Sequence, residues 1–174
     1  MQSPAPRVPR RPAATRTDID ARLTVELASV VAGARRRALR DGDRQVDTAH
    51  LLHSLIESDA EVRTTLGDGP QVARVLGYLV QRSIGYGLRW QGSVEDSGTL
   101  PVVRETDGGL SGWSPAAAAA MGAALERAEL RGEARAAGID LLACLAVDRE
   151  CRAVEVLRRA GMDPAVLGGR IAAG

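Results

Sequence analysis

Apolar residues recur at spacings of three and four along most of the chain, which is the period of a helix with one buried face. In the first such segment the stripe consists of Leu27, Val30, Val31, Ala34 and Ala38. Eight segments follow this pattern, and turns rich in glycine, proline or aspartate separate them. The predicted helices cover about 25–41, 48–57, 60–66, 71–84, 115–131, 138–147, 150–160 and 165–173. The sequence therefore predicts an all-α fold.

Residues that favour helix ends flank these segments. Thr24 is suited to cap the first helix, and either Asp47 or Thr48 is suited to cap the second, because their side-chain oxygens can accept from free backbone N–H groups. Ser114 followed by Pro115 is a strong start signal, since serine favours the N-cap and proline the first helical position. These signals support the boundaries taken from the apolar pattern.

The stretch 45–56 returns once as a weaker copy, at a constant offset of 90 residues. Leu51 aligns with Leu141 and Leu52 with Leu142, without a gap. The same offset pairs Leu55 with Leu145, Thr24 with Ser114, Ala34 with Ala124, Arg37 with Arg127, Ala38 with Ala128 and Gly42 with Gly132. This regularity indicates that one helical unit is present twice.

The composition divides the chain into four parts. Residues 1–18 are a tail rich in proline and arginine, and residues 19–84 are the first repeat. Glycines and Pro101 break any helix within 85–113, which we interpret as a linker, either irregular or with a short hairpin. Such a linker is long enough to be a functional loop. The second repeat covers 114–174.

Two interpretations of the N-terminal tail follow from its composition. Four prolines and four arginines with a single valine within residues 1–16 cannot bury a core, so we expect an extended, solvated segment. Its two P-x-x-P spacings, Pro6 to Pro9 and Pro9 to Pro12, also fit a ligand for a proline-recognition domain or an anchor on nucleic acid. A nucleic-acid-associated regulatory protein using this basic tail is the alternative function.

Charge and hydropathy exclude several classes of protein. The 174 residues carry a formal net charge of +1, so no global field attracts nucleic acid, and nucleic-acid binding is not expected of the folded part. No segment is apolar and long enough to span a bilayer, and the N-terminus lacks the apolar core of a signal peptide. We therefore expect no membrane association and a cytoplasmic location.

The candidate chemical groups are few. His50 and His53 lie three residues apart on one helix, but a metal site needs three or four converging ligands, so packed histidines are the better reading. Cys144 is the cysteine that could pair with a histidine for nucleophilic catalysis, yet it sits on the apolar frame of the second repeat, as an inert core thiol would. Neither a G-x-S-x-G nor a Walker A motif occurs. We predict no enzymatic activity, no metal and no cofactor.

The duplicated segment resembles a known motif. Thr48, His50, Leu51 and Leu52 match the Gly-Thr-Glu-His-hydrophobic-Leu-Leu motif of the Clp repeat, and Leu141 and Leu142 keep its hydrophobic frame in the second copy. Trp113-Ser114-Pro115 is similar to the Phe-Thr-Pro that commonly opens the second repeat of that family. Over residues 19–174 the chain thus resembles the N-terminal domain of AAA+ unfoldases of the ClpA and ClpC type, in which the motif residues are structural.

The resemblance implies two pseudo-symmetric four-helix repeats and a non-catalytic function. Domains of this family dock adaptors, unfolded substrates and, in actinobacterial members, cyclic peptide antibiotics. By resemblance, the partners are Clp unfoldase or protease components, adaptors, substrate peptides or a cyclic peptide, and the chain would act as a regulator or a decoy for such ligands. The residues expected to contact a ligand are Leu23, Val31, Trp113, Pro115 and Met121.

Two features depart from the family or stay open. Ala49 and Ile139 occupy the positions of the motif glutamates that hold phosphoarginine in the family. A guanidinium needs a carboxylate for bidentate pairing, so phosphoarginine recognition is not expected to be carried over. Trp113 either anchors a peptide ligand or covers the seam between the repeats, and Trp90 favours a surface contact.

Overall fold

The computed structural model describes residues 15–84, 95, 110 and 112–174, and within them every regular element is an α-helix. The all-α prediction is therefore confirmed. The helices are α1 (Arg16–Asp20), α2 (Val25–Asp41), α3 (Thr48–Ser58), α4 (Ala60–Leu66), α5 (Gly69–Ser83), α6 (Pro115–Leu130), α7 (Gly138–Val147), α8 (Arg152–Arg159) and α9 (Pro164–Ala173).

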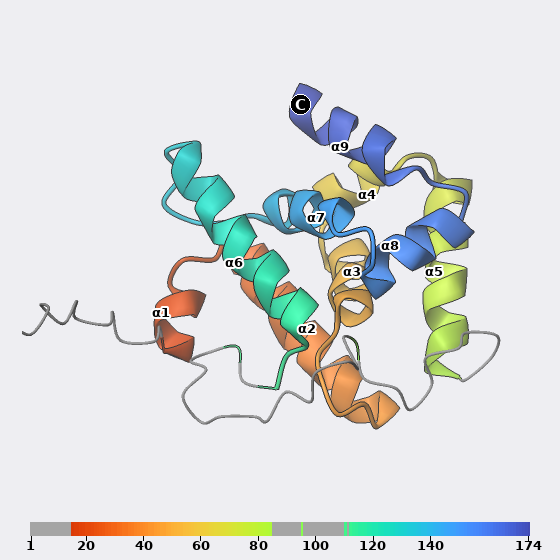
Figure 1. Cartoon of the computed structure of the whole chain (residues 1–174), viewed down its shortest axis with the longest axis horizontal. Coiled ribbons are helices and arrows are strands. Elements are labelled where there is room, and N and C mark those ends of the chain that lie inside the picture. Colours follow the sequence, from red (N-terminus) through yellow and green to blue (C-terminus); the bar gives the residue numbers. More distant parts are fainter. Residues whose placement is uncertain (1–14, 85–94, 96–109, 111) are drawn as a thin grey trace, which may run out of the picture.

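The two repeats, α2–α5 and α6–α9, pack into one structure around α3 and α7 (Figure 1). The two motif helices lie at the centre, with α2 and α6 on one side and the remaining repeat helices on the other. Leucines from both copies of the motif are fully buried in a single core, namely Leu51, Leu52, Leu55, Leu141, Leu142 and Leu145. Small residues such as Ala34 and Ala124, both fully buried, let the long helices approach closely.

The segment before α2 pairs with the segment before α7. Thr24 N–H donates to the Ala136 carbonyl at 2.9 Å, and Ala136 N–H donates to the Arg22 carbonyl at 2.8 Å. These two bonds form an isolated parallel bridge between Leu23 and Ala136. The entry to the first helix of repeat 1 is thus fixed by the motif of repeat 2.

The equivalent pairing joins the segment before α6 to the segment before α3. These segments lie 90 residues after the one before α2 and 90 residues before the one before α7. Ser114 N–H donates to the Val46 carbonyl at 2.9 Å, and Val46 N–H donates to the Gly112 carbonyl at 2.8 Å. Trp113 and Val46 form the corresponding parallel bridge. The two pairs are related by the repeat offset, so each repeat supplies backbone partners that the other lacks.

A close approach explains why the second motif copy begins with glycine. Gly138 opens α7, and a Cβ atom there would lie 2.1 Å from Asp59 Oδ2 and 3.1 Å from Leu55 Cδ2. The Asp59 carboxylate cannot swing away freely, because its Oδ1 caps α4 through the N–H groups of Glu61 at 2.9 Å and Val62 at 3.1 Å. Glycine at 138 lets α7 pack against the start of α4.

The structure differs from the sequence-based expectations at α1 and at the start of α8. Helix α1 lies mostly in the segment that composition assigns to the tail, and a reciprocal cap between Thr15 and Asp18 stabilises it. Helix α8 begins at Arg152 and not at Glu150, since Asp148 instead accepts from the Glu150 N–H in a preceding turn. The tail residues 1–14, Trp90 and most of the linker, including its proposed hairpin, lie outside the described residues, so those predictions stay untested.

None of the described helices combines the length and the hydropathy that a membrane-spanning segment needs.

Substitution of Gly138 by alanine tests the close approach. Although alanine favours helices, the added methyl group meets Asp59 and Leu55, so Gly138→Ala should destabilise the protein by about 1–3 kcal/mol in urea unfolding. Gly169→Ala on α9 is the matched control: beyond its chain neighbours and the backbone of α9, no described atom lies within 4 Å of the position that its methyl group would take, and we expect a gain of roughly 0.5–1 kcal/mol. Equal gains at both positions would contradict the packing described above.

Candidate functional site

The first motif copy lies at the seam and is organised by Asp47. Asp47 caps α3, with Oδ1 accepting from the His50 N–H at 2.9 Å. Its Oδ2 accepts from Arg152 Nη1 of α8 at 2.7 Å and from Arg82 of α5. Burial alone would raise the pKa of this carboxyl, but the hydrogen bonds and charges of His50 and Arg82 hold the pKa well below its usual range. Asp47 is therefore a buried, fully paired carboxylate that joins both repeats.

Glu95 places a second carboxylate between the repeats. It accepts from Thr48 N–H at 3.0 Å and Thr48 Oγ1 at 2.6 Å in α3, and from Arg152 N–H at 2.9 Å at the start of α8. Ser114, the N-cap of α6, donates its hydroxyl at 2.6 Å. Negative charge is favourable at helix N-termini, and here one carboxylate serves two of them. The side chain is 5% exposed.

The second motif copy has its own buried acid, Asp140, at the position of His50. Asp140 Oδ2 accepts from the Ala137 N–H and from Arg131 Nη2, both at 2.9 Å, and Oδ1 lies 3.2 Å from Arg127 Nε. The motif resemblance covers only the hydrophobic frame of this copy, so Asp140 was not among the predicted site residues. An acidic residue three positions after a helix N-cap was the available signal.

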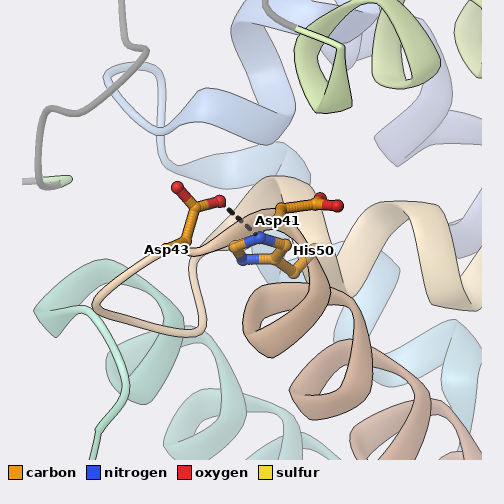
Figure 2. Close-up of side chains that lie close together, drawn as sticks. All are labelled: Asp41, Asp43 and His50. Atoms are coloured by element: carbon orange, nitrogen blue, oxygen red, sulfur yellow. Dashed lines mark hydrogen bonds and ion pairs between the residues drawn. The ribbon is translucent and has the colours of Figure 1, made fainter.

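Figure 2 shows Asp41, Asp43 and His50, a trio whose oxygen and nitrogen atoms lie close enough to raise the question of a metal ion. His50 Nε2 lies 2.9 Å from Asp43 Oδ2, while Nδ1 accepts from the Asp47 N–H at 3.0 Å. Arg82 Nη2 donates to the same Asp43 Oδ2 at 3.2 Å, so a guanidinium already neutralises the carboxylate that a metal ion would need. The trio does not fit a metal site.

The cysteines are not prepared for nucleophilic chemistry. Cys151 is 2% exposed, and burial raises the pKa of its thiol to about 11. Burial also raises the pKa of Cys144, which is partly buried. Among the described residues, no hydrogen bond joins Cys144 to His50 or His53. Reactive cysteines need a lowered pKa, so both thiols have the properties of core residues.

The residues predicted to contact a ligand lie mostly beneath the surface. Four of the five are buried, whereas Pro115 is exposed; the buried ones are Leu23, Val31, Trp113 and Met121. The guanidinium of Arg35 stacks over the Trp113 ring at 5.8 Å from its centroid. The indole Nε1 of Trp113 is buried and has no hydrogen-bond partner among the described residues. Trp113 thus covers the seam, and its role in ligand binding stays a prediction.

The motif residues are all in the core. Six of them are 0–1% exposed: Thr48, His50, Leu51, Leu52, Leu141 and Leu142. At the positions of the family's glutamates, Ala49 is fully buried and Ile139 is partly buried, and neither offers a carboxylate. Neither residue supplies the carboxylate that a guanidinium needs for bidentate pairing, and the loss of phosphoarginine recognition stays a prediction.

Comparison with known proteins supports the fold through structure alone. No family model matches the sequence, and no curated protein matches it either. The N-terminal domain of the Clp-associated chaperone ClpD from Arabidopsis thaliana is similar in structure, with a TM-score of 0.64 and 21% identity over 87% of this chain and 93% of that one. A protein of a malarial protein secretion system has a TM-score of 0.61 and 12% identity over the same shares. The chain therefore has the fold of a Clp N-terminal domain.

The two histidines should give the stability a maximum near pH 6.5. Burial, with Arg37 nearby, lowers the pKa of His53 to about 4, so folding favours its neutral form and stability falls as the pH drops below about 6.5. For His50 burial also lowers the pKa, but the hydrogen bonds to Asp43 and Asp47 outweigh it and raise the pKa overall. Stability from His50 is present below about pH 6.5 and is lost as the pH rises through its folded pKa.

Urea unfolding between pH 5 and 8.5 measures both limbs, each with a slope of at most about 1.4 kcal/mol per pH unit for one proton. His53→Gln should flatten the limb between pH 5 and 6.5, and His50→Gln the limb above 6.5. A limb that survives removal of its histidine would show that another group causes it.

Proposed function

We propose that this chain is a non-catalytic module that binds proteins or peptides at the seam between its repeats. The fold it shares with the ClpD N-terminal domain supports this proposal, as does its motif-level resemblance to a family that docks adaptors and unfolded substrates. The partners we propose are components of a Clp unfoldase or protease, adaptors, substrate peptides or a cyclic peptide. The module would regulate the traffic of these ligands or act as a decoy for them.

The single observation that carries the proposal is the indole N–H of Trp113, which has no acceptor within the part of the chain that the structure describes. A buried donor without an acceptor costs on the order of 1–3 kcal/mol. Trp113 is bridged to Val46 across the seam and lies two residues before the exposed Pro115. A peptide carbonyl inserted beside Pro115 would satisfy the indole.

The state of the other polar groups favours binding over catalysis. Asp47, Glu95 and Asp140 are engaged with helix N-termini and arginines, and His50 is held between two aspartates. Catalytic groups need access to a substrate and a suitable pKa. Asp47 and Glu95 instead hold the repeats together, and Asp140 and His50 fix the motif helices within their own repeats.

Calorimetry with Trp113→Phe tests the proposal. The probes are an adaptor protein of a Clp unfoldase, an unfolded protein and an actinobacterial cyclic peptide. We expect micromolar or tighter binding of at least one probe, weakened about tenfold by Trp113→Phe, which keeps an aromatic ring but removes the N–H donor.

Leu125→Met, a volume-conserving change in the buried face of α6, is the control and should bind as the unchanged protein does. Both variants must also unfold at similar urea concentrations. Absence of binding to all three probes would refute a Clp-ligand function, and full binding by Trp113→Phe would remove the indole from the site.

A further inference from the structure

The outer face of repeat 2 carries an apolar groove that the seam does not involve. Two hollows, of about 580 and 440 Å³, lie along α7 and share Ala143, Val147 and Gly168 in their walls. One extends towards α8 and the start of α9, and the other towards the end of α6 and of α9. Figure 1 shows α7 beside both α6 and α9. We refer to the two neighbouring hollows together as the repeat-2 groove.

Large apolar side chains at the groove are left in solvent. Leu130 on α6 is 89% exposed and Val147 on α7 is 79% exposed. Much of the remaining wall consists of alanine and glycine, including Ala123, Ala143 and Gly168. Exposed apolar side chains around a hollow mark an interaction site more often than a chance arrangement. A wall of small side chains also lets the backbone of a partner helix come close.

The equivalent face of repeat 1 shows that this character is not imposed by the fold. At the repeat offset, Leu130 corresponds to Arg40, Val147 to Glu57 and Ala143 to His53. There, Glu57 pairs with Arg37 and lies 3.3 Å from His53 Nε2, so charged groups cover the surface. The same architecture is thus polar in one repeat and open and apolar in the other.

Charge along the groove is predominantly positive. Four arginines line it against two acids, Glu126 and Asp163. Asp163 is engaged in capping α9, with Oδ1 accepting from Ala165 N–H at 2.8 Å. Arg127 and Arg131 are 36% and 41% exposed, while the Asp140 they pair with is completely buried beneath them. Arg149 and Arg158 are exposed at the other end. A ligand therefore meets guanidinium groups at both ends of an apolar floor.

We propose that the repeat-2 groove docks an amphipathic α-helix of a partner protein, with an apolar face against α7 and acidic residues along its edges. The apolar face would cover Leu130 and Val147, and the acidic edges would meet the arginines at either end. This surface uses none of the residues assigned to the seam, so it stands independently of the function proposed above.

The probe is a fluorescein-labelled 18-residue helical peptide with leucine and alanine on one face and glutamate along both edges. Its counterpart has lysine in place of every glutamate. Fluorescence anisotropy should show the acidic peptide binding at least about tenfold more tightly than the basic one.

Filling the groove tests the location. Gly168→Gln adds a long side chain to a wall of the groove, where no described atom beyond its chain neighbours and the backbone of α9 lies within 4 Å of the Cβ position, and it should weaken binding about tenfold. Gly169→Gln, one residue along α9, has the same open surroundings but lies outside the groove walls, and should change affinity less than about twofold.

Cys144 provides a readout at the site itself. It lines the groove and is partly buried, whereas Cys151 is 2% exposed. Saturating acidic peptide should slow alkylation of Cys144 by iodoacetamide at least about threefold, while bound basic or scrambled peptide should not. Protection of Cys144 that is lost in Gly168→Gln would place the peptide in the groove.

Charge reversal separates this groove from general attraction. Arg149→Glu should weaken the acidic peptide about fivefold, whereas Arg36→Glu, an exposed arginine on α2, should have little effect. Equal binding of acidic and basic peptides, or unchanged binding by Gly168→Gln, would overturn the proposal. So would a concentration-dependent dimer that protects Cys144 without peptide, because a second copy would then cover the groove. Trp113→Phe should leave binding of the acidic peptide unchanged, whatever the result of the calorimetry proposed for the seam.

Discussion

The crossed backbone pairing between the repeats is the constraint on which the rest of this structure depends. The Thr24 N–H donates to Ala136, and the Ala136 N–H donates to Arg22. The equivalent bonds run from Ser114 to Val46 and from Val46 to Gly112, and all four are 2.8–2.9 Å long. Each helix that begins a repeat is therefore anchored to the motif of the opposite repeat. Because α3 and α7 also share one core, neither repeat has a complete set of backbone partners or a complete apolar interior alone. The duplication gives one cooperative unit and not two domains in series.

Buried charge at the seam is tolerated because nearly every polar atom is paired. Asp47 binds two arginines and a helix N-terminus, and Glu95 receives four hydrogen bonds from both repeats. Removing one partner from such a buried pair typically costs about 3–5 kcal/mol, so these residues are bound to their structural task. Asp47 and Glu95, whose carboxylates could otherwise act in catalysis or bind a metal, are therefore engaged in hydrogen bonds within the protein. Among the described residues, the seam leaves the Trp113 indole available, and the outer face of repeat 2 leaves apolar surface.

The sequence predicted features that depend on local pattern and missed those that depend on distant pairing. Local pattern is enough to recognise the apolar stripe in α2, the Ser114-Pro115 start of α6 and the 90-residue offset. The corresponding helices lie where these patterns predict them. Glu95 could not be recognised, because its partners Thr48 and Arg152 are 47 and 57 residues away. The need for Gly138 likewise arises from Asp59, which only the folded chain brings near. Candidate ligand residues such as Val31 were placed by resemblance, although the apolar stripe of α2 already predicts that Val31 faces the core, where the structure places it.

Native-state hydrogen exchange at the seam amides tests the crossed pairing most directly. The four relevant N–H groups belong to Thr24, Val46, Ser114 and Ala136. If the repeats fold only together, these amides should exchange with the same opening free energy, and the same urea dependence, as the core amide of Leu51. Exchange of either pair through a smaller opening, while Leu51 stays protected, would mean that the repeats separate without unfolding and would contradict the account.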